Sequence, residues 1–396
     1  MNRKQFVLLL VLLVILGGAG LFINNSRKAA ASSGEVGIGR KLLGDKFDVN
    51  DVVHISIKSG TNELNLFKKD LWRVRERNDY PANFLEVSGF LIKAAGLKIV
   101  QNEQVGASQL PRLQLAPPGQ GTNSGILVEF KGKDDKTIQA LTLGKPHMRK
   151  APQQGQIGDG EGFPDGRYVM LPGNSKDILL IGDPLNTVEP NAGPWLNKDF
   201  FKVERPKAIS VTYPVATNCW RLARDTETGE WKLAEPKPGE NLDTNKLSSV
   251  TSAFASPSFN DVVSTNSKPE DIGLDKPRIV TIETFDDFAY TLKLGQKSGD
   301  EYPLTINVVA NFPKERMPAK DEKPEDKDKA DKAWKERQKQ LETNLQQAKK
   351  FENWVFLVPS WNVDALLKDR KELLIEKKEE PKPVESAEPV VPALEK

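Results

Sequence analysis

The sequence contains little of the chemistry that enzymes and metal sites most often use. Its 396 residues include one cysteine, Cys219, and two histidines, His54 and His147. A single cysteine excludes an intrachain disulfide and any cysteine-based metal cluster. The histidines lie far apart in the sequence without metal-ligand spacing, so we expect structural or surface roles for both. Cys219 has no histidine in its own half of the chain, and we expect it to behave as a small buried apolar residue.

Strong charge of one sign is also missing. The formal net charge is +2, from 57 Lys and Arg residues against 55 Asp and Glu residues. This balance argues against a nucleic-acid partner, because nucleic-acid binders carry a basic face. The sequence has no phosphate-binding loop, dinucleotide fingerprint or nucleophile elbow. We therefore predict no catalytic residues, no cofactor and no metal, and interpret the protein as non-enzymatic.

Two pairs of adjacent carboxylates are the remaining candidates for acid–base chemistry. They are Asp134-Asp135 and Asp286-Asp287, at matching positions between apolar strand patterns. Adjacent Asp residues between two strands are typical of turns, where they hydrogen-bond the local backbone. We expect hairpin tips at both places, and a hydrolase that uses these four residues is the less favoured alternative.

One long apolar stretch lies near the N-terminus. Residues 6–23 contain no charged side chain and follow Arg3 and Lys4. About 20 apolar residues span a bilayer, so we predict a signal-anchor over residues 1–28 that enters the inner membrane through residues 6–23. The bulk of the chain would then lie in the periplasm or extracytoplasmic space. A cleaved secretory signal is the alternative, because residues 6–16 match its apolar core and residues 29–31 offer a cleavage site. Residues 29–50 are expected to form a flexible stalk.

The remainder of the chain repeats itself. Short apolar motifs of the first half return in the same order in the second half, which is the signature of a duplicated unit. The matches are Ile55-Ser56-Ile57 with Ile209-Ser210-Val211, Leu64-Asn65-Leu66 with Trp220-Arg221-Leu222, Trp72-Arg73-Val74 with Trp231-Lys232-Leu233, Leu141-Thr142-Leu143-Gly144 with Leu292-Lys293-Leu294-Gly295, and residues 168–172 with 355–359. We predict two tandem modules, residues 51–204 and 205–377.

Each copy combines strand hairpins with one helix. In the first copy Phe84, Val87, Leu91 and Ala95 recur at three- and four-residue steps, which predicts a helix that buries this face. The second copy has a helix from residue 243 or 244 that buries Leu247, Val250 and Phe254. Trp72 and Trp231 are expected in the cores. The fold class is therefore α+β: two copies of an antiparallel β-meander with one covering helix.

The copies differ most in the loop that follows Gly144 and Gly295. In the first copy this loop covers residues 145–167, and in the second it grows to residues 296–353, with a strand expected at residues 304–309. Its charged insert, residues 313–351, carries Trp334, Leu341, Leu345 and Ala348 on one helical stripe. We interpret Trp334, Leu341 and Leu345 as candidate interaction residues, in contact either with the parent module or with a partner helix. The tail, residues 378–396, is expected to be disordered.

The chain resembles a bacterial family called domain of unknown function 4340. The resemblance is carried by Ile55-Ser56-Ile57-Lys58, by residues 64–74, by Tyr80-Pro81-Ala82 before the helix, and by residues 272–278 before a hairpin. It implies an envelope protein, and some members are encoded beside gliding-motility-type ABC transporters. It implies no catalytic residues. We therefore expect a membrane-anchored binding or scaffolding element of a membrane complex, with an ABC transporter or other envelope proteins as partners. The alternative is a ligand-binding module for envelope polysaccharide or peptide, with Trp195 or Trp361 as exposed aromatic contacts.

Overall fold

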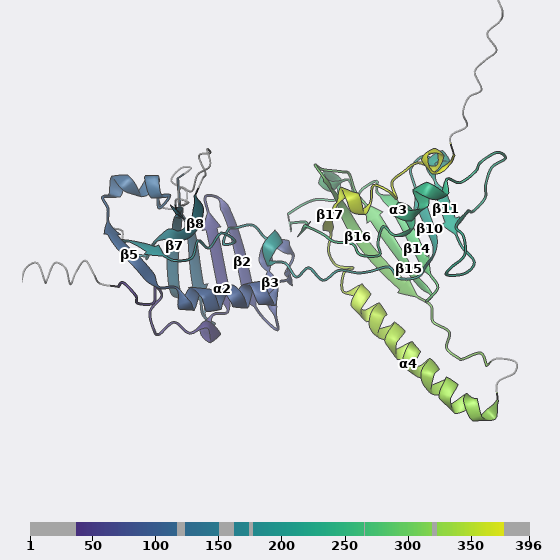
Figure 1. Cartoon of the computed structure of the whole chain (residues 1–396), viewed down its shortest axis with the longest axis horizontal. Coiled ribbons are helices and arrows are strands. Elements are labelled where there is room, and N and C mark those ends of the chain that lie inside the picture. Colours follow the sequence, from purple (N-terminus) through teal and green to yellow (C-terminus); the bar gives the residue numbers. More distant parts are fainter. Residues whose placement is uncertain are drawn as a thin grey trace, which may run out of the picture. The chain divides into compact units, whose positions relative to one another are not determined.

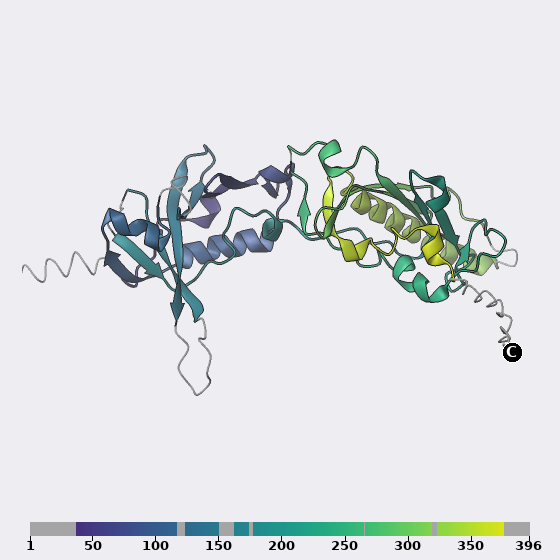
Figure 2. The same ribbon diagram turned by 90° about the horizontal axis from the view of Figure 1, so that it is seen from above.

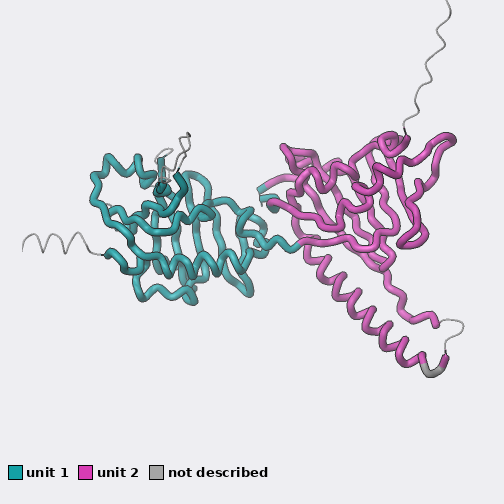
Figure 3. The backbone as a smooth tube through the Cα atoms, viewed as in Figure 1, with its two compact units in different colours: residues 1–199, 261–266 teal, residues 200–260, 267–396 magenta. Residues whose placement is uncertain are grey.

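The computed structural model describes residues 37–116, 123–149, 162–173, 177–264, 266–318 and 323–375. The expected membrane anchor at residues 6–23 and the expected tail at residues 378–396 lie outside these ranges. Within them, no helix combines the length and apolar character that a membrane span needs. The chain forms two compact units, unit 1 with residues 1–199 and 261–266, and unit 2 with residues 200–260 and 267–396 (Figure 3).

Unit 1 is an antiparallel sheet with helix α2 (Phe84–Gly96) on one face (Figure 1). Its strands follow the order β4-β3-β2-β1-β6-β7-β8-β9-β5, so the first hairpin and the later strands join through the β1–β6 pair. The strands are β1 (His54–Ser59), β2 (Asn62–Lys68), β3 (Trp72–Val74), β4 (Tyr80–Pro81), β5 (Ile99–Gln104), β6 (Ile126–Lys131), β7 (Thr137–Arg149), β8 (Phe163–Met170) and β9 (Asp177–Ile181). The short strand β13 (Asp261–Val262) lies in the later segment that groups with this unit.

Unit 2 repeats the same strand order. Its strands follow β12-β11-β10-β14-β15-β16-β17, which corresponds position by position to β3-β2-β1-β6-β7-β8-β9 of unit 1. The two helices of unit 2 are α3 (Leu247–Thr251) and α4 (Pro324–Lys349). The strands are β10 (Pro206–Thr212), β11 (Trp220–Ala223), β12 (Lys232–Leu233), β14 (Arg278–Thr284), β15 (Phe288–Leu294), β16 (Glu301–Ala310) and β17 (Phe356–Pro359). The antiparallel α+β architecture is thereby confirmed.

The strand registers correct one of the repeat matches. Leu143 of β7 pairs with Val169 of β8, and its counterpart Leu294 of β15 pairs with Leu304 of β16. The counterpart of β8 is therefore β16. The sequence match of residues 168–172 with residues 355–359 was wrong, because it aligned β8 with β17. Both segments are short apolar strands next to a proline, and such patterns do not identify a single partner.

The copies consequently diverge at two different connections. In unit 1 the long segment joins β7 to β8, whereas in unit 2 β15 and β16 are separated only by residues 295–300. The insert of unit 2 lies one connection later, between β16 and β17, and contains α4. The expected strand at residues 304–309 exists, but it is part of the repeated sheet and not part of the insert. The copies therefore share the strand order that starts at β3 in unit 1 and at β12 in unit 2, and they differ in which hairpin is extended.

Residues 37–50 belong to unit 1 and not to a free stalk. The backbone N–H of Leu42 donates to the carbonyl of Leu97 at 2.8 Å, and Leu42 and Leu43 are buried. Phe47 packs edge-on against Phe130 with ring centroids 5.2 Å apart. The many Gly, Lys and Asp residues of this segment favoured a loop by composition, but its few large apolar side chains attach it to the core.

Helix α2 lies along one side of the unit 1 sheet (Figure 2). Asn83 caps its first turn, because the Asn83 side chain accepts hydrogen bonds from the backbone N–H groups of Leu85 and Glu86. Its buried residues are Val87, Phe90, Leu91 and Ala94. The expectation of a helix here is confirmed, but its buried face differs from the expected one, because Phe84 is 63% exposed.

In each unit a backbone carbonyl lies very close to a glycine of the sheet. A Cβ atom on Gly144 would lie 2.5 Å from the carbonyl oxygen of Leu113, and a Cβ atom on Gly295 would lie 2.1 Å from that of Ile272. These carbonyls belong to the 3-10 helices η3 (Ala107–Leu113) and η7 (Glu270–Ile272), which precede β6 and β14 in the chain. The repeated Leu-x-Leu-Gly motif therefore has a packing cause: only a residue without a side chain lets the turn reach the sheet.

We predict that Gly144→Ala and Gly295→Ala each lower the free energy of unfolding of their own unit by about 1–3 kcal/mol, because a backbone carbonyl must move. The control is Gly89→Ala in α2, where a Cβ atom would meet nothing within 4 Å. That variant should be neutral or more stable by up to about 1 kcal/mol. Urea unfolding measures all three, and equal stability of the three variants would contradict the packing explanation.

Candidate binding surfaces

Both Asp pairs lie at hairpin tips, as predicted. Asp135 and Asp287 adopt the left-handed conformation, with φ of 57° and 61°. The backbone N–H of Asp135 donates to the carbonyl of Gly132, and that of Asp287 donates to Thr284. Asp286 accepts ion pairs from Arg205 and Arg337. Both Asp pairs therefore lie in turns, which confirms the turn interpretation, and the carboxylate of Asp286 binds neighbouring cations.

His54 is part of a polar network inside unit 1. Its ring nitrogens lie 2.7 Å from a carboxylate oxygen of Asp135 and 2.8 Å from the amide oxygen of Asn65. The amide nitrogen of Asn65 in turn donates to Glu76 at 2.8 Å. The hydrogen bond from His54 holds the pKa of Asp135 below its ordinary value. This network joins the β6–β7 hairpin to β1, β2 and η2 (Arg75–Arg77), which fits the structural role expected for His54.

His147 and Cys219 also have partners close by. His147 lies 2.6 Å from Asp165 on the neighbouring strand. Cys219 is half-buried, and its sulfur accepts a hydrogen bond from the backbone N–H of Tyr213 at 3.2 Å. Among the described residues, no group of three or more His, Cys, Asp or Glu side chains is arranged to hold a metal ion.

The tryptophans separate into core and surface residues. Trp72 and Trp195 are buried, and Trp195 packs edge-on against Phe90 with ring centroids 5.6 Å apart. Trp195 therefore lies in the core and is not the exposed ligand contact that the sequence allowed. Trp231, expected in the core, is half-buried beneath Arg224, whose guanidinium lies 4.8 Å from the ring centroid. Trp361 is 68% exposed.

The candidate interaction residues of the insert lie on helix α4, which packs against β16 of its own unit. Leu341 and Ala348 are buried, while Trp334 and Leu345 are half-buried. The helix leaves the sheet and extends beyond it toward its N-terminal end (Figure 1). Arg337 pairs with Asp286, and Glu352 accepts a hydrogen bond from the backbone N–H of Val308 at 2.8 Å. The stripe is therefore turned to the parent module, which was one of the two expected arrangements.

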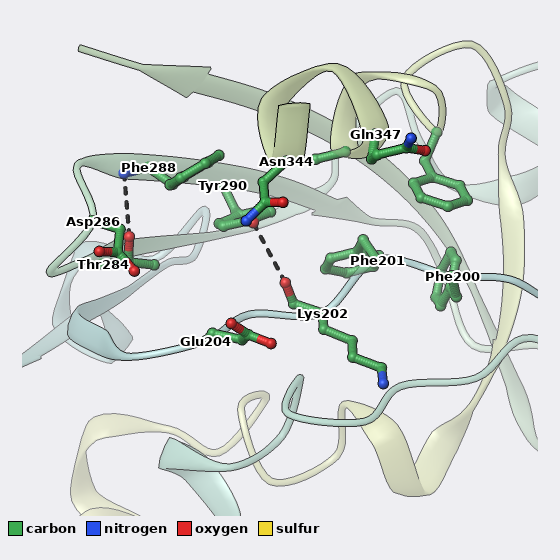
Figure 4. A pocket seen from close by; sticks show the side chains of 12 residues that line it. Phe200, Phe201, Lys202, Glu204, Thr284, Asp286, Phe288, Tyr290, Asn344 and Gln347 are labelled. Atoms are coloured by element: carbon green, nitrogen blue, oxygen red, sulfur yellow. Dashed lines mark hydrogen bonds between the residues drawn. The ribbon is translucent and has the colours of Figure 1, made fainter. Parts of the chain in front are cut away.

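A pocket of about 250 Å³ opens where α4 meets the sheet (Figure 4). Asn344 and Gln347 of α4 lie over the rings of Phe201 and Tyr290, and Lys202 and Glu204 lie on the opposite side. The hydroxyl of Tyr290 donates to the carbonyl of Lys202 at 3.4 Å, and burial raises the pKa of Tyr290 to about 12. The pocket offers aromatic surface with polar groups at its edge, and α4 forms one of its walls.

A third surface is the outward face of α2. Leu85 is 76% exposed and Ile92 is 66% exposed, and Phe84 lies beside them at the start of the helix. Leu85, Gly89, Ile92 and Gly96 follow one another at four, three and four residues, so they share one stripe of the helix. This stripe is hard to recognise from the sequence, because α2 is apolar on two faces. The recurrence of apolar and small residues at positions 85, 89, 92 and 96 was the available signal.

We predict that Leu341→Ala releases α4 from the sheet. Removing a buried leucine side chain costs about 2–5 kcal/mol, which is large for a helix held on one side. Hydrogen exchange of the α4 backbone amides should become faster, whereas the exposed neighbour variant Gln340→Ala should leave them unchanged. Equal exchange in the two variants would contradict docking through this stripe.

Comparison with known proteins gives one match. The family profile described as Domain of unknown function (DUF4340) matches residues 72–277. Neither a search of curated proteins nor a search of solved structures finds a similar protein. The matched span begins in β3, continues through α2 and the start of unit 2, and ends just before β14. Because this span covers more than half of the 396 residues, the chain belongs to the DUF4340 family.

Proposed function

We propose that this protein is a membrane-anchored, non-catalytic binding or scaffolding element of a membrane complex, such as an ABC transporter assembly. We further propose that unit 1 contacts its partner through the outward face of α2. The partner surface that fits best is an apolar helix of an integral membrane subunit. The observation that carries the proposal is the exposure of Phe84, Leu85 and Ile92 on one helix.

The exposed apolar side chains of α2 favour association, because association removes them from water. An amphipathic helix on a globular domain normally turns polar side chains outward, whereas α2 has large apolar side chains on both faces. Full burial of a side chain such as leucine or isoleucine contributes about 1.5–3 kcal/mol. Contiguous exposed apolar surface on a folded domain is typical of interaction sites. Covering this stripe therefore supplies a driving force for association.

The shape of the stripe favours a helix as the occupant. Gly89 and Gly96 alternate along the stripe with Leu85 and Ile92, and a Cβ atom on either glycine would meet nothing within 4 Å. Glycines at such positions let the backbone of a second helix approach closely, while the large neighbours fill the spaces beside it. This arrangement suits membrane-protein helices, whose contacts depend on small residues and close packing.

The length of the tether limits where unit 1 can act. Thirteen residues, 24–36, separate the expected anchor from Gly37, and a chain of that length reaches at most about 45 Å. With residues 6–23 in the bilayer, the start of unit 1 would remain within that distance of the membrane. A membrane subunit is therefore the partner that the stripe would meet at the highest local concentration.

The proposal predicts that Leu85→Gln combined with Ile92→Gln removes the protein from its membrane complex. Full-length protein is solubilised in mild detergent, and the size of its complex is measured by native electrophoresis. At least a tenfold loss of the assembled fraction is expected. Val309→Gln combined with Met317→Gln is the matched control, because both side chains are exposed and apolar but belong to unit 2.

An unchanged complex in the α2 variant would reject the interface. Thermal unfolding of that variant should match the parent protein, because both substituted side chains are exposed. Alkaline extraction of membranes tests the anchor separately. Release of the chain into the soluble fraction would reject the anchor without deciding the interface.

A ligand-binding module remains the second candidate function. The exposure of Trp361 favours it, because an uncovered indole offers a stacking surface for a sugar or peptide ring. Binding of cell-wall glycan fragments that is lost in Trp361→Ala, together with an intact complex in the α2 variant, would select this function.

A further inference from the structure

A groove of about 770 Å³ opens at one end of unit 2. Three segments form it: the connection after β10, the segment from η7 to the start of β14, and the β15–β16 hairpin. Its walls carry Tyr213 from the first segment, Lys276 and Arg278 from the second, and Lys297 and Tyr302 from the third. Gly273 and Gly295, which bring η7 against the sheet, form part of its floor.

The charges in the groove favour an anion. Lys276, Arg278 and Lys297 line it, against the carboxylates of Glu270 and Asp275. Lys297 is engaged by Asp364 at 3.6 Å, whereas neither Lys276 nor Arg278 is in an ion pair within the described part of the chain. Two cations in an open groove therefore have no carboxylate partner, although carboxylates are present along the same walls.

Tyr302 lines the groove together with Arg278, and its hydroxyl donates to Asp364 at 3.0 Å. The ammonium group of Lys297 lies 5.5 Å from the centroid of the Tyr302 ring. Arg278 is half-buried, so its side chain has less conformational freedom to lose on binding a ligand than an exposed arginine has.

The first module shows that the fold does not require these charges. Arg278 pairs with Leu294 in the register of β14 and β15, and Ile126 pairs with the corresponding Leu143 in unit 1. Ile126 therefore stands where Arg278 stands. By the same alignment Ser124 corresponds to Lys276, and Pro146 corresponds to Lys297. At these three positions the cationic side chains occur in the second module and not in the first, on a scaffold that both modules share.

We infer that this groove binds the anionic group of a small ligand, a carboxylate or a phosphate. The guanidinium of Arg278 supplies two parallel donors to the oxygens, the geometry that suits both anions. Lys276 supplies a second positive charge at the mouth. The ring of Tyr302 and the apolar edge of Val215 bound the space that the remainder of the ligand occupies. The inference is independent of the α2 interface.

The test is calorimetric titration of the full-length chain in detergent with three probes: inorganic phosphate, glucuronate and glucose. Saturable binding of phosphate or glucuronate, with no binding of glucose, is expected, and the probe that binds more tightly identifies the anion. Arg278→Gln should weaken that binding at least tenfold, and Lys276→Gln at least threefold. The matched control is Lys293→Gln, which removes the same charge from an exposed position on β15 outside the groove.

Three outcomes would overturn the inference. They are the absence of saturable binding for both anions, an equal effect of Lys293→Gln and Arg278→Gln, and equal binding of glucose. Circular dichroism confirms that each variant is folded. If Arg278→Gln does not fold, Lys276→Gln alone decides, because Lys276 is exposed and its substitution leaves the sheet intact.

Discussion

The two modules depend on one close contact, between the carbonyl of a 3-10 turn and a glycine in the following hairpin. In unit 1 the partners are Leu113 and Gly144, and in unit 2 they are Ile272 and Gly295. The contact holds against the sheet the turn that precedes β6 or β14, the strand that joins the first hairpin to the rest of the sheet. A side chain at the glycine would separate the turn from the sheet. The anion groove of unit 2 is built around the same contact, because Gly273 and Gly295 form part of it.

The two modules share this sheet but differ in the helices that lie at its surface. In unit 1 the covering helix α2 is apolar toward the core and also apolar toward solvent. In unit 2 the corresponding helix α3 has little more than one turn, and the long helix α4 is an addition between β16 and β17. The two units therefore share their strand order, while the candidate binding features belong to different elements in each unit.

The repeat and its hairpins could be predicted because their signals are local. The Leu-x-Leu-Gly motifs reflect a steric requirement, and the Asp pairs reflect turn chemistry. Predictions that needed a choice between similar apolar segments were less successful. Residues 168–172 and 355–359 look alike, but only the strand register shows that they occupy different places in the sheet. Likewise, the three- and four-residue spacing located α2 but not its buried face, because two of its faces are apolar. Two further features depend on tertiary packing and could not be predicted from local sequence patterns. They are the burial of Leu341 against the sheet and the cationic groove.

The central claim is that the outward face of α2 is covered by a membrane subunit in the assembled protein. The most direct measurement places a photo-crosslinking residue at position 92 of the full-length chain in cells, with position 133 at the β6–β7 hairpin tip as the control. The account predicts one discrete adduct from position 92 that contains a peptide of an integral membrane protein, and no such adduct from position 133. Absence of an adduct from position 92, or the same adduct from both positions, would contradict it.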